Sequence, residues 1–397
     1  MATNSFGYAG FVAVLAIIGL LASEMLGSDR LAGIPSAAAT VGTALAATPL
    51  ALRSKRRGRR SGIMAGYLIG AAGAALGFAA AQAGSFAVLV VAMALFGVAN
   101  ASNLQNRFTA ADLATEERRA SSIALVVWVG TIGAVIGSPT SAWVNRRGID
   151  FGLAEWATPL LLGIIGFLVA AAVVFLLLRP DPLVVAGGLD PEASGGNPLA
   201  NAARSWGSIW PNPQARLAIT AMAFSQMAMV AVMTMTPLHM RDHGHADLST
   251  LVIALHVLGM FGLSPLIGRW ADRMGRIRTL MIGAATLGLG TFASVAAGYI
   301  PALIFAGLFL LGVGWSFALI AGSALLTESL PLADRVGAQG LSDVAMSLLG
   351  AVAAFGSGLV KESVGYHWLA NFGTLTAVFI LFVAMRALRT SYEPATQ

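Results

Sequence analysis

Soft metal-binding side chains gather in one stretch of the chain. Seven of the fifteen methionines and four of the five histidines lie within residues 222–260. Met229 and Met233 are four residues apart, and so are His256 and Met260. This spacing places each pair on one face of a helix, one turn apart. Thioether and imidazole groups are ligands that suit a soft ion such as Cu(I), so these four residues form a candidate copper site.

The segment between the two pairs holds further possible ligands, namely His239, Met240, His243 and His245. We predict that they collect metal at the outer mouth of the site. Four neutral soft ligands suit a monovalent soft cation, whereas Mg²⁺ and Ca²⁺ prefer oxygen ligands. The alternative interpretation is that the methionines only pack, since methionine fills irregular space in apolar helices.

The elements that must position these residues are membrane-spanning helices. The chain is 57% hydrophobic and only 11% charged, whereas soluble proteins carry about 25% charged residues. Apolar runs near the ~20 residues needed to cross a bilayer recur along its whole length. The 46 glycines are typical of helices that approach each other closely in a membrane. The chain has no cysteine, which excludes disulfides and thiolate metal sites.

We predict an all-α membrane protein with twelve transmembrane helices in two pseudo-symmetric six-helix bundles. The predicted spans are 6–27, 31–52, 61–82, 84–110, 119–143, 156–179, 215–238, 248–268, 278–298, 300–327, 338–360 and 366–389. Residues 1–179 form the N-terminal bundle and residues 215–397 the C-terminal bundle. The polar segment 180–214 between them is rich in proline and glycine and is predicted to be a linker.

Basic residues predict the orientation of the spans. On this map, 18 of the 24 lysines and arginines lie on one side. The positive-inside rule places that side in the cytoplasm, with both termini and the linker. The predicted location is the bacterial inner membrane, where the lipid bilayer is the surrounding partner. The net charge of +6 needs no nucleic-acid partner, because topology and anionic lipid account for it. We expect a monomer.

The two halves of the sequence repeat with an offset of 217 residues. This offset carries Gly58 onto Gly275 and Arg118 onto Arg335. Two such halves joined by a cytoplasmic linker are the layout of one large class of secondary transporters. The repeat therefore predicts a transporter that alternates between outward-open and inward-open states.

A loop motif strengthens that interpretation. The segment from Gly268 to Arg278 reads GRWADRMGRIR and resembles the loop signature of the major facilitator superfamily. The resemblance implies a cytoplasmic gating motif made of Gly268, Asp272, Arg273, Gly275, Arg276 and Arg278. The carboxylate of Asp272 is expected to accept hydrogen bonds from helix N-terminal amides and nearby arginines. The first half departs from the signature, because Lys55 stands where the offset would place the aspartate.

The Met-x-x-x-Met and His-x-x-x-Met pairs on spans seven and eight resemble those of the CcoA-type copper importers of this superfamily. The matching residues are Met229, Met233, His256 and Met260. The resemblance implies import of copper ions across the bacterial inner membrane for cytochrome oxidase assembly. Copper would be the cargo, and no cofactor is expected. This chain departs from cysteine-containing members, because it has no thiol.

Other polar residues at membrane depth are candidates for cavity lining or ion coupling. They are Asn100, Asn103, Arg107, Glu24 and Asp343. With the span-five motif from Gly130 to Pro139, they favour a second hypothesis, a proton-coupled exporter of small amphipathic organic molecules like the drug antiporters. A third hypothesis is a membrane protein that binds metal and passes it to a partner without transport. No catalytic constellation is present, so we expect no enzyme.

Overall fold

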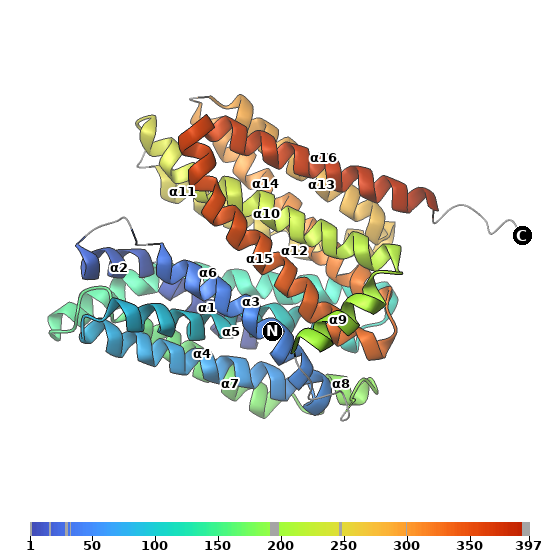
Figure 1. The fold of residues 1–397 in the computed structure, drawn as a ribbon, viewed down its shortest axis with the longest axis horizontal. Coiled ribbons are helices and arrows are strands. Elements are labelled where there is room, and N and C mark those ends of the chain that lie inside the picture. The colour runs from blue at the N-terminus through green and yellow to red at the C-terminus, as the bar shows by residue number, and fades with distance from the viewer. Residues whose placement is uncertain are drawn as a thin grey trace, which may run out of the picture. The chain divides into compact units, whose positions relative to one another are not determined.

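The computed structural model describes residues 2–15, 17–27, 31, 33–190, 198–245, 248–298 and 300–390. Within these ranges the regular elements are all helices, as Figure 1 shows. The side chains of Ser138 and Pro139, in the span-five motif, lie outside the described part. The fold class predicted from the sequence is confirmed.

The helices up to the linker follow the first six predicted spans. They are α1 (Ala2–Leu15), α2 (Ile18–Leu26), α3 (Ile34–Arg57), α4 (Arg59–Gln82), α5 (Phe86–Asp112), the short 3₁₀ helix η2 (Glu116–Arg118), α6 (Arg119–Asp150) and α7 (Pro159–Leu177). The linker region contains α8 (Pro182–Val185) and α9 (Pro198–Ile209).

The remaining helices follow the last six predicted spans. They are α10 (Pro213–Asp242), α11 (Ser249–Phe261), α12 (Ser264–Met274), α13 (Arg276–Ala296), α14 (Pro301–Glu328), α15 (Leu332–Val364) and α16 (Tyr366–Thr390). Eleven stretches of the described residues are long and apolar enough to cross a membrane. Helix α6 lies at the position of the fifth predicted span.

Three predicted boundaries need correction. The eighth span, predicted as one helix, is interrupted between α11 and α12, just before Pro265. Proline has no amide hydrogen and cannot continue the helical hydrogen bonds of the preceding turn. The eleventh span is longer than predicted and covers Leu332–Val364. The linker is partly helical, although its residues 191–197 lie outside the described residues.

Two glycines related by the sequence repeat separate pairs of consecutive helices. Gly58 lies between α3 and α4 with φ 89° and ψ 159°, and Gly275 lies between α12 and α13 with φ 90° and ψ 153°. Side chains with a Cβ atom rarely adopt this backbone conformation. The offset of 217 residues thus corresponds to a repeated turn in the structure.

Close helix packing also depends on glycine. A methyl group at Gly97 on α5 would overlap with the carbonyl oxygen of Ala39 on α3. In the second half, a Cβ at Gly259 on α11 would lie 2.5 Å from the carbonyl oxygen of Phe309 on α14. Backbones therefore touch at these crossings, as expected for helices that associate within a membrane.

The chain divides into two compact units. Unit 1 comprises Met1–Leu113, Val129–Arg204 and Leu332–Val344, and unit 2 comprises Ala114–Trp128, Ser205–Pro331 and Ala345–Gln397. Helices α6 and α15 are thus each shared between the units. In unit 1, the ring of Phe96 stacks on Phe11 with centroids 5.4 Å apart and contacts Phe167 at 5.1 Å. In unit 2, α14 packs against α10, α11 and α13.

Candidate functional site

The carboxylate of Asp272 lies at the first turn of α6. Its Oδ1 atom accepts a hydrogen bond from the Ala120 amide at 3.0 Å. Its Oδ2 atom accepts from the Ser121 amide at 2.9 Å and from the Ser121 hydroxyl at 2.5 Å. Amides at a helix N-terminus favour an anion, so this contact stabilises the start of α6. A Cβ at Gly268 would lie 2.5 Å from that of Ala124, so only glycine permits this approach.

Arg276 joins three parts of unit 2. Its Nη1 atom lies 2.9 Å from Asp272 Oδ1, one turn earlier on the chain. Its Nε and Nη2 atoms donate to the carboxylate of Glu328, at 3.1 and 2.8 Å. Its Nη2 atom also donates to the carbonyl oxygen of Glu116. A guanidinium shared by several acceptors holds α12, α14 and η2 in one arrangement.

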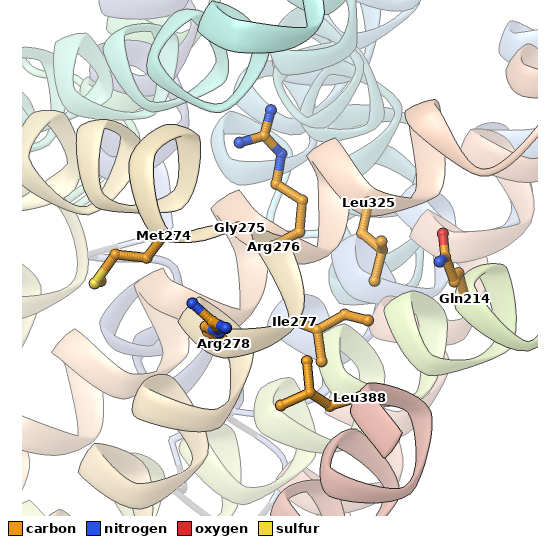
Figure 2. A pocket seen from close by; sticks show the side chains of 8 residues that line it. All are labelled: Gln214, Met274, Gly275, Arg276, Ile277, Arg278, Leu325 and Leu388. Carbon is orange, nitrogen blue, oxygen red and sulfur yellow. The ribbon is translucent and has the colours of Figure 1, made fainter. Parts of the chain in front are cut away.

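The other basic residues of the gating motif are placed differently. Arg273 and Arg278 are exposed. Figure 2 shows a pocket of about 370 Å³ beside Gly275. Its lining consists of Gln214, Met274, Gly275, Arg276, Ile277, Arg278, Leu325 and Leu388. The predicted motif thus separates into a bonded group around Asp272 and an exposed basic group beside a pocket.

The first half builds the equivalent turn with different residues. Lys55, at the position that matches the gating carboxylate, lies 3.3 Å from Asp190. The first amides of α4 donate instead to Asp181 from the linker region, Arg59 at 3.1 Å and Arg60 at 2.8 Å. The carboxylate missing from the first-half motif is therefore supplied from farther along the chain, which spacing within the motif alone does not reveal.

A buried ion pair repeats between the two halves. The Nε and Nη2 atoms of Arg59 donate to both carboxylate oxygens of Asp112, at 2.8 and 3.1 Å. The sequence offset relates this pair to Arg276 and Glu328. Both members of the first-half pair are almost fully buried. Arg59 also donates to the side chain of Gln339 on α15 at 2.6 Å. The repeat contained the signal for Arg59, but it became informative only once its partner was visible.

A second buried ion pair joins two residues that the sequence marked separately. Arg107 Nη2 lies 2.5 Å from Asp343 Oδ1, and both side chains are buried. Arg107 also donates to the carbonyl oxygen of Leu104 at 2.9 Å, and its guanidinium lies 4.4 Å from the ring centre of Phe108. Within the described part of the chain, Asp343 Oδ2 has no hydrogen-bond partner. An incompletely paired carboxylate at membrane depth is a candidate site for ion coupling.

A chain of neutral polar groups runs through the interior of unit 1. The Tyr67 hydroxyl donates to Asn103 Oδ1 at 2.7 Å and accepts from Asn106 Nδ2 at 2.8 Å. Asn106 also donates to Asn4 Oδ1 on α1 at 3.1 Å. A Cβ at Gly7 would overlap with this group, so glycine lets α1 approach it. Asn103 Nδ2 finds no acceptor among the described residues.

Three members of this chain of polar groups were not among the predicted sites, namely Asn4, Tyr67 and Asn106. A single asparagine in an apolar span would have been a signal for Asn4. The predicted Asn100 is half-buried on α5, and Glu24 is exposed on α2. The structure therefore brings Asn103 into the polar chain and Arg107 into the ion pair, while it places Glu24 at the surface.

The soft-ligand residues are largely buried. Met229 lies on α10 and Met260 on α11, both buried, while Met233 is half-buried. His256 is fully buried, and its Nδ1 atom lies 2.7 Å from the carbonyl oxygen of Leu308 on α14. Helices α10 and α11 each pack mainly against α14 and contact each other far less. The best-defined contact of the imidazole is therefore with α14.

The outer histidine cluster is packed rather than open. The ring of His239 is buried and stacks on Tyr366 with centroids 4.2 Å apart. The His243 ring lies 4.3 Å from that of His239. Met240 is buried, and His245 is half-buried. Among the residues the structure describes, no group of three or more His, Cys, Asp or Glu side chains is placed to hold a metal ion.

Comparison with known proteins identifies the family. The model of the Major Facilitator Superfamily matches residues 1–262 and 244–397. The chain belongs to the major facilitator superfamily. This transporter is 36% identical over 384 residues to the uncharacterized MFS-type transporter YdeG of Bacillus subtilis (strain 168), covering 96% of this chain and 89% of YdeG.

Two further comparisons place the transporter among better described proteins. It is 30% identical over 361 residues to the riboflavin transporter RfnT of Brucella anthropi, covering 90% of this chain and 87% of RfnT. Its fold is similar to that of the proton:xylose symporter XylE bound to 6-bromo-6-deoxy-D-glucose, with a TM-score of 0.76. That match covers 98% of this chain and 97% of XylE, at 16% identity, and so concerns the fold alone.

Proposed function

We propose that this transporter carries a small, polar organic solute with a heteroaromatic ring, by alternating access. Riboflavin is the first solute to test, because the Brucella relative named for riboflavin transport shares 30% of its residues over most of both chains. Transport in the inner membrane, with both termini cytoplasmic, follows the positive-inside prediction. The orientation and the direction of transport are part of the proposal.

The observation that carries this proposal is the chain of neutral polar groups in unit 1. Asn103 has a buried donor without an acceptor among the described residues. A buried polar group without a partner is costly, so it favours a ligand that supplies one. Ring carbonyl and hydroxyl groups of a solute such as riboflavin would accept from this amide. Uncharged amides also match an uncharged solute better than they match a metal cation.

The test is uptake of radiolabelled riboflavin into proteoliposomes that contain the purified transporter. We expect uptake by the wild type and a loss of about tenfold or more in Asn103→Ala, since one hydrogen bond to a bound solute contributes about 1.5 kcal/mol. Asn100→Ala removes the same group one turn earlier on α5 and serves as the matched control, with a smaller loss. Absence of riboflavin uptake by folded wild-type protein would reject this solute.

Copper import is the second candidate, and one observation favours it. The Nδ1 atom of His256 contacts a backbone carbonyl oxygen, while Nε2 is buried with no partner in the described part of the chain. A histidine that donates from one ring nitrogen and leaves the other free has the arrangement found in metal ligands. Met260 follows one turn later on the same helix.

Copper uptake into the same proteoliposomes tests this candidate. If copper is the cargo, wild-type protein takes it up and the double variant Met229→Ala/His256→Ala does not. Met227→Ala provides the control, because it removes a neighbouring thioether outside the proposed pairs. Riboflavin uptake that survives the double variant, with no copper uptake by any form, would leave the organic solute as the only cargo.

A further inference from the structure

Two helices are divided between the units at positions related by the sequence repeat. Residues 114–128, at the start of α6, belong to unit 2, and residues 332–344, at the start of α15, belong to unit 1. An offset of 217 carries residue 128 onto residue 345. Each unit therefore contains the first part of a helix whose remainder belongs to the other unit, and each must hold that part by contacts of its own.

The two units hold these segments by different chemistry. Unit 2 binds the start of α6 through Asp272, whose carboxylate accepts from backbone amides. Unit 1 has Lys55 at the matching position and binds residues 332–344 through side chains of α15. Asp343 pairs with Arg107, and Gln339 accepts from Arg59. The packing is close, since a Cβ at Gly340 would lie 2.7 Å from that of Ala51 on α3.

The groups that face Asp343 form a buried cluster of balanced charge. Helix α5 contributes Arg107 and Asp112, helix α4 contributes Arg59, and α1 contributes the phenol of Tyr8. Asp112 uses both of its carboxylate oxygens to bind Arg59. Asp343 uses only Oδ1, and its Oδ2 atom is buried without a partner within the described ranges. Of the two carboxylates, Asp343 therefore has the oxygen that is free to take a proton.

We propose that Asp343 is the proton-binding group of this transporter and that Arg107 is its counter-ion. A proton from solvent binds Oδ2, the carboxylate becomes a neutral acid, and the ion pair with the guanidinium is lost. Arg107 keeps its bond to the Leu104 carbonyl and its contact with Phe108 but becomes a buried cation without an anion. That state is unfavourable in the closed packing, so residues 332–344 separate from α5 and water reaches the site.

This inference rests on transport by alternating access but not on the identity of the solute. Binding of the proton and separation of the α15 segment are one event, because the same ion pair opposes both. The hold on α6 through Asp272 has no free carboxylate oxygen, so protonation acts on one of the two shared helices. The pair thus links proton binding to one half of the conformational cycle.

Cysteine labelling tests the proposal without any solute. The chain has no cysteine, so Ser342→Cys creates one thiol beside Asp343, at a site that is fully buried. At neutral pH, a soluble maleimide should label this cysteine about tenfold faster, or more, when Asp343→Asn is added, because the amide mimics the protonated acid. The ratio of the two labelling rates at one pH cancels the thiol's own pH dependence, and it should fall towards one as the pH is lowered.

Two further variants make the result decisive. Asp343→Glu keeps a titratable acid and should restore the slow labelling at neutral pH. A cysteine at Ser323, fully buried on α14, should stay unlabelled in every form and so reports correct folding. Equal labelling rates with and without the Asp343→Asn substitution, at all pH values in folded protein, would overturn the proposal.

A transport measurement gives a second readout. Uptake of the transported solute should rise several-fold under an imposed pH gradient in wild-type protein, and this ratio should approach one in Asp343→Asn. A variant that keeps the wild-type ratio would also overturn the proposal. If neither riboflavin nor copper is taken up, the proposed cargo fails, while the labelling experiment still decides the proton site.

Discussion

At the scale of single residues, the polar groups inside unit 1 carry more information than their sequence positions suggest. Asn103 and Arg107 are four residues apart on α5, so both were expected on one face. They serve different groups, because Asn103 contacts Tyr67 whereas Arg107 pairs with Asp343. Neutral and charged polar groups thus form two neighbouring sets. We assign solute binding to the neutral set and proton binding to the charged set.

Tyr67→Phe tests the neutral set. The substitution removes the hydroxyl between Asn103 and Asn106 and leaves both buried amides with fewer partners. Loss of a partner for a buried polar group costs about 1–3 kcal/mol, so the midpoint of thermal unfolding in detergent should fall. Thr40→Val is the control, since its hydroxyl bonds only to the carbonyl of Ser36 on its own helix. An unchanged midpoint in Tyr67→Phe would contradict the hydrogen-bonded chain.

At the scale of helices, close approach of backbones determines the packing. Helices α3 and α5 cross so tightly that Gly97 meets the carbonyl of Ala39, and the Thr43 hydroxyl donates to the Gly97 carbonyl at 2.8 Å. Lipid tails are as apolar as leucine, so helices in a membrane gain little from burial alone. Packing between small residues and hydrogen bonds between helices then stabilise the bundle.

Gly97→Ala tests this packing. The added methyl group has no space unless α3 and α5 move apart, and overpacking of this kind costs about 1–3 kcal/mol. Gly207→Ala in α9 is the matched control, because a Cβ there meets nothing within 4 Å. We expect a lower unfolding midpoint and lower solute uptake for the first variant, and an unchanged or slightly higher midpoint for the second. Equal midpoints would refute the close crossing.

At the scale of the whole molecule, the sequence repeat is a repeat of structure with altered chemistry. The turn at Gly58 and Gly275 and the ion pairs of Arg59 and Arg276 recur. The hold on the shared helices does not recur, since Asp272 binds backbone amides in one half and Asp343 binds a guanidinium in the other. Two similar halves with unequal contacts provide distinct controls for the two shared helices.

Asp272→Asn tests the control on α6. The amide cannot accept all the bonds that the carboxylate accepts, and it cannot pair with Arg276. Removing such a group from a helix N-terminus costs about 0.5–2 kcal/mol, so we expect altered uptake rates and a lower unfolding midpoint. Arg273→Gln, one residue along, changes an exposed side chain and should behave like the wild type. Identical behaviour of the two variants would argue against a gating role for Asp272.

Much of the protein was determined by the sequence alone. Apolar runs of spanning length require helices, because backbone amides in lipid must be paired within the segment. The offset of 217 residues predicted two related halves, and the GRWADRMGRIR loop predicted the family that the family model confirmed. These features are local or periodic along the chain, so they can be recognised without knowing which residues meet.

The tertiary structure decided which side chains meet. Arg107 and Asp343 are 236 residues apart, and no local pattern links them. Asp181 supplies the carboxylate that the first-half loop lacks, from a segment that the sequence predicted as linker. The spacing of the methionines and histidines predicted shared helix faces correctly in principle, but the neighbour of each face is set by packing. His256 contacts α14 because glycines let those two backbones approach.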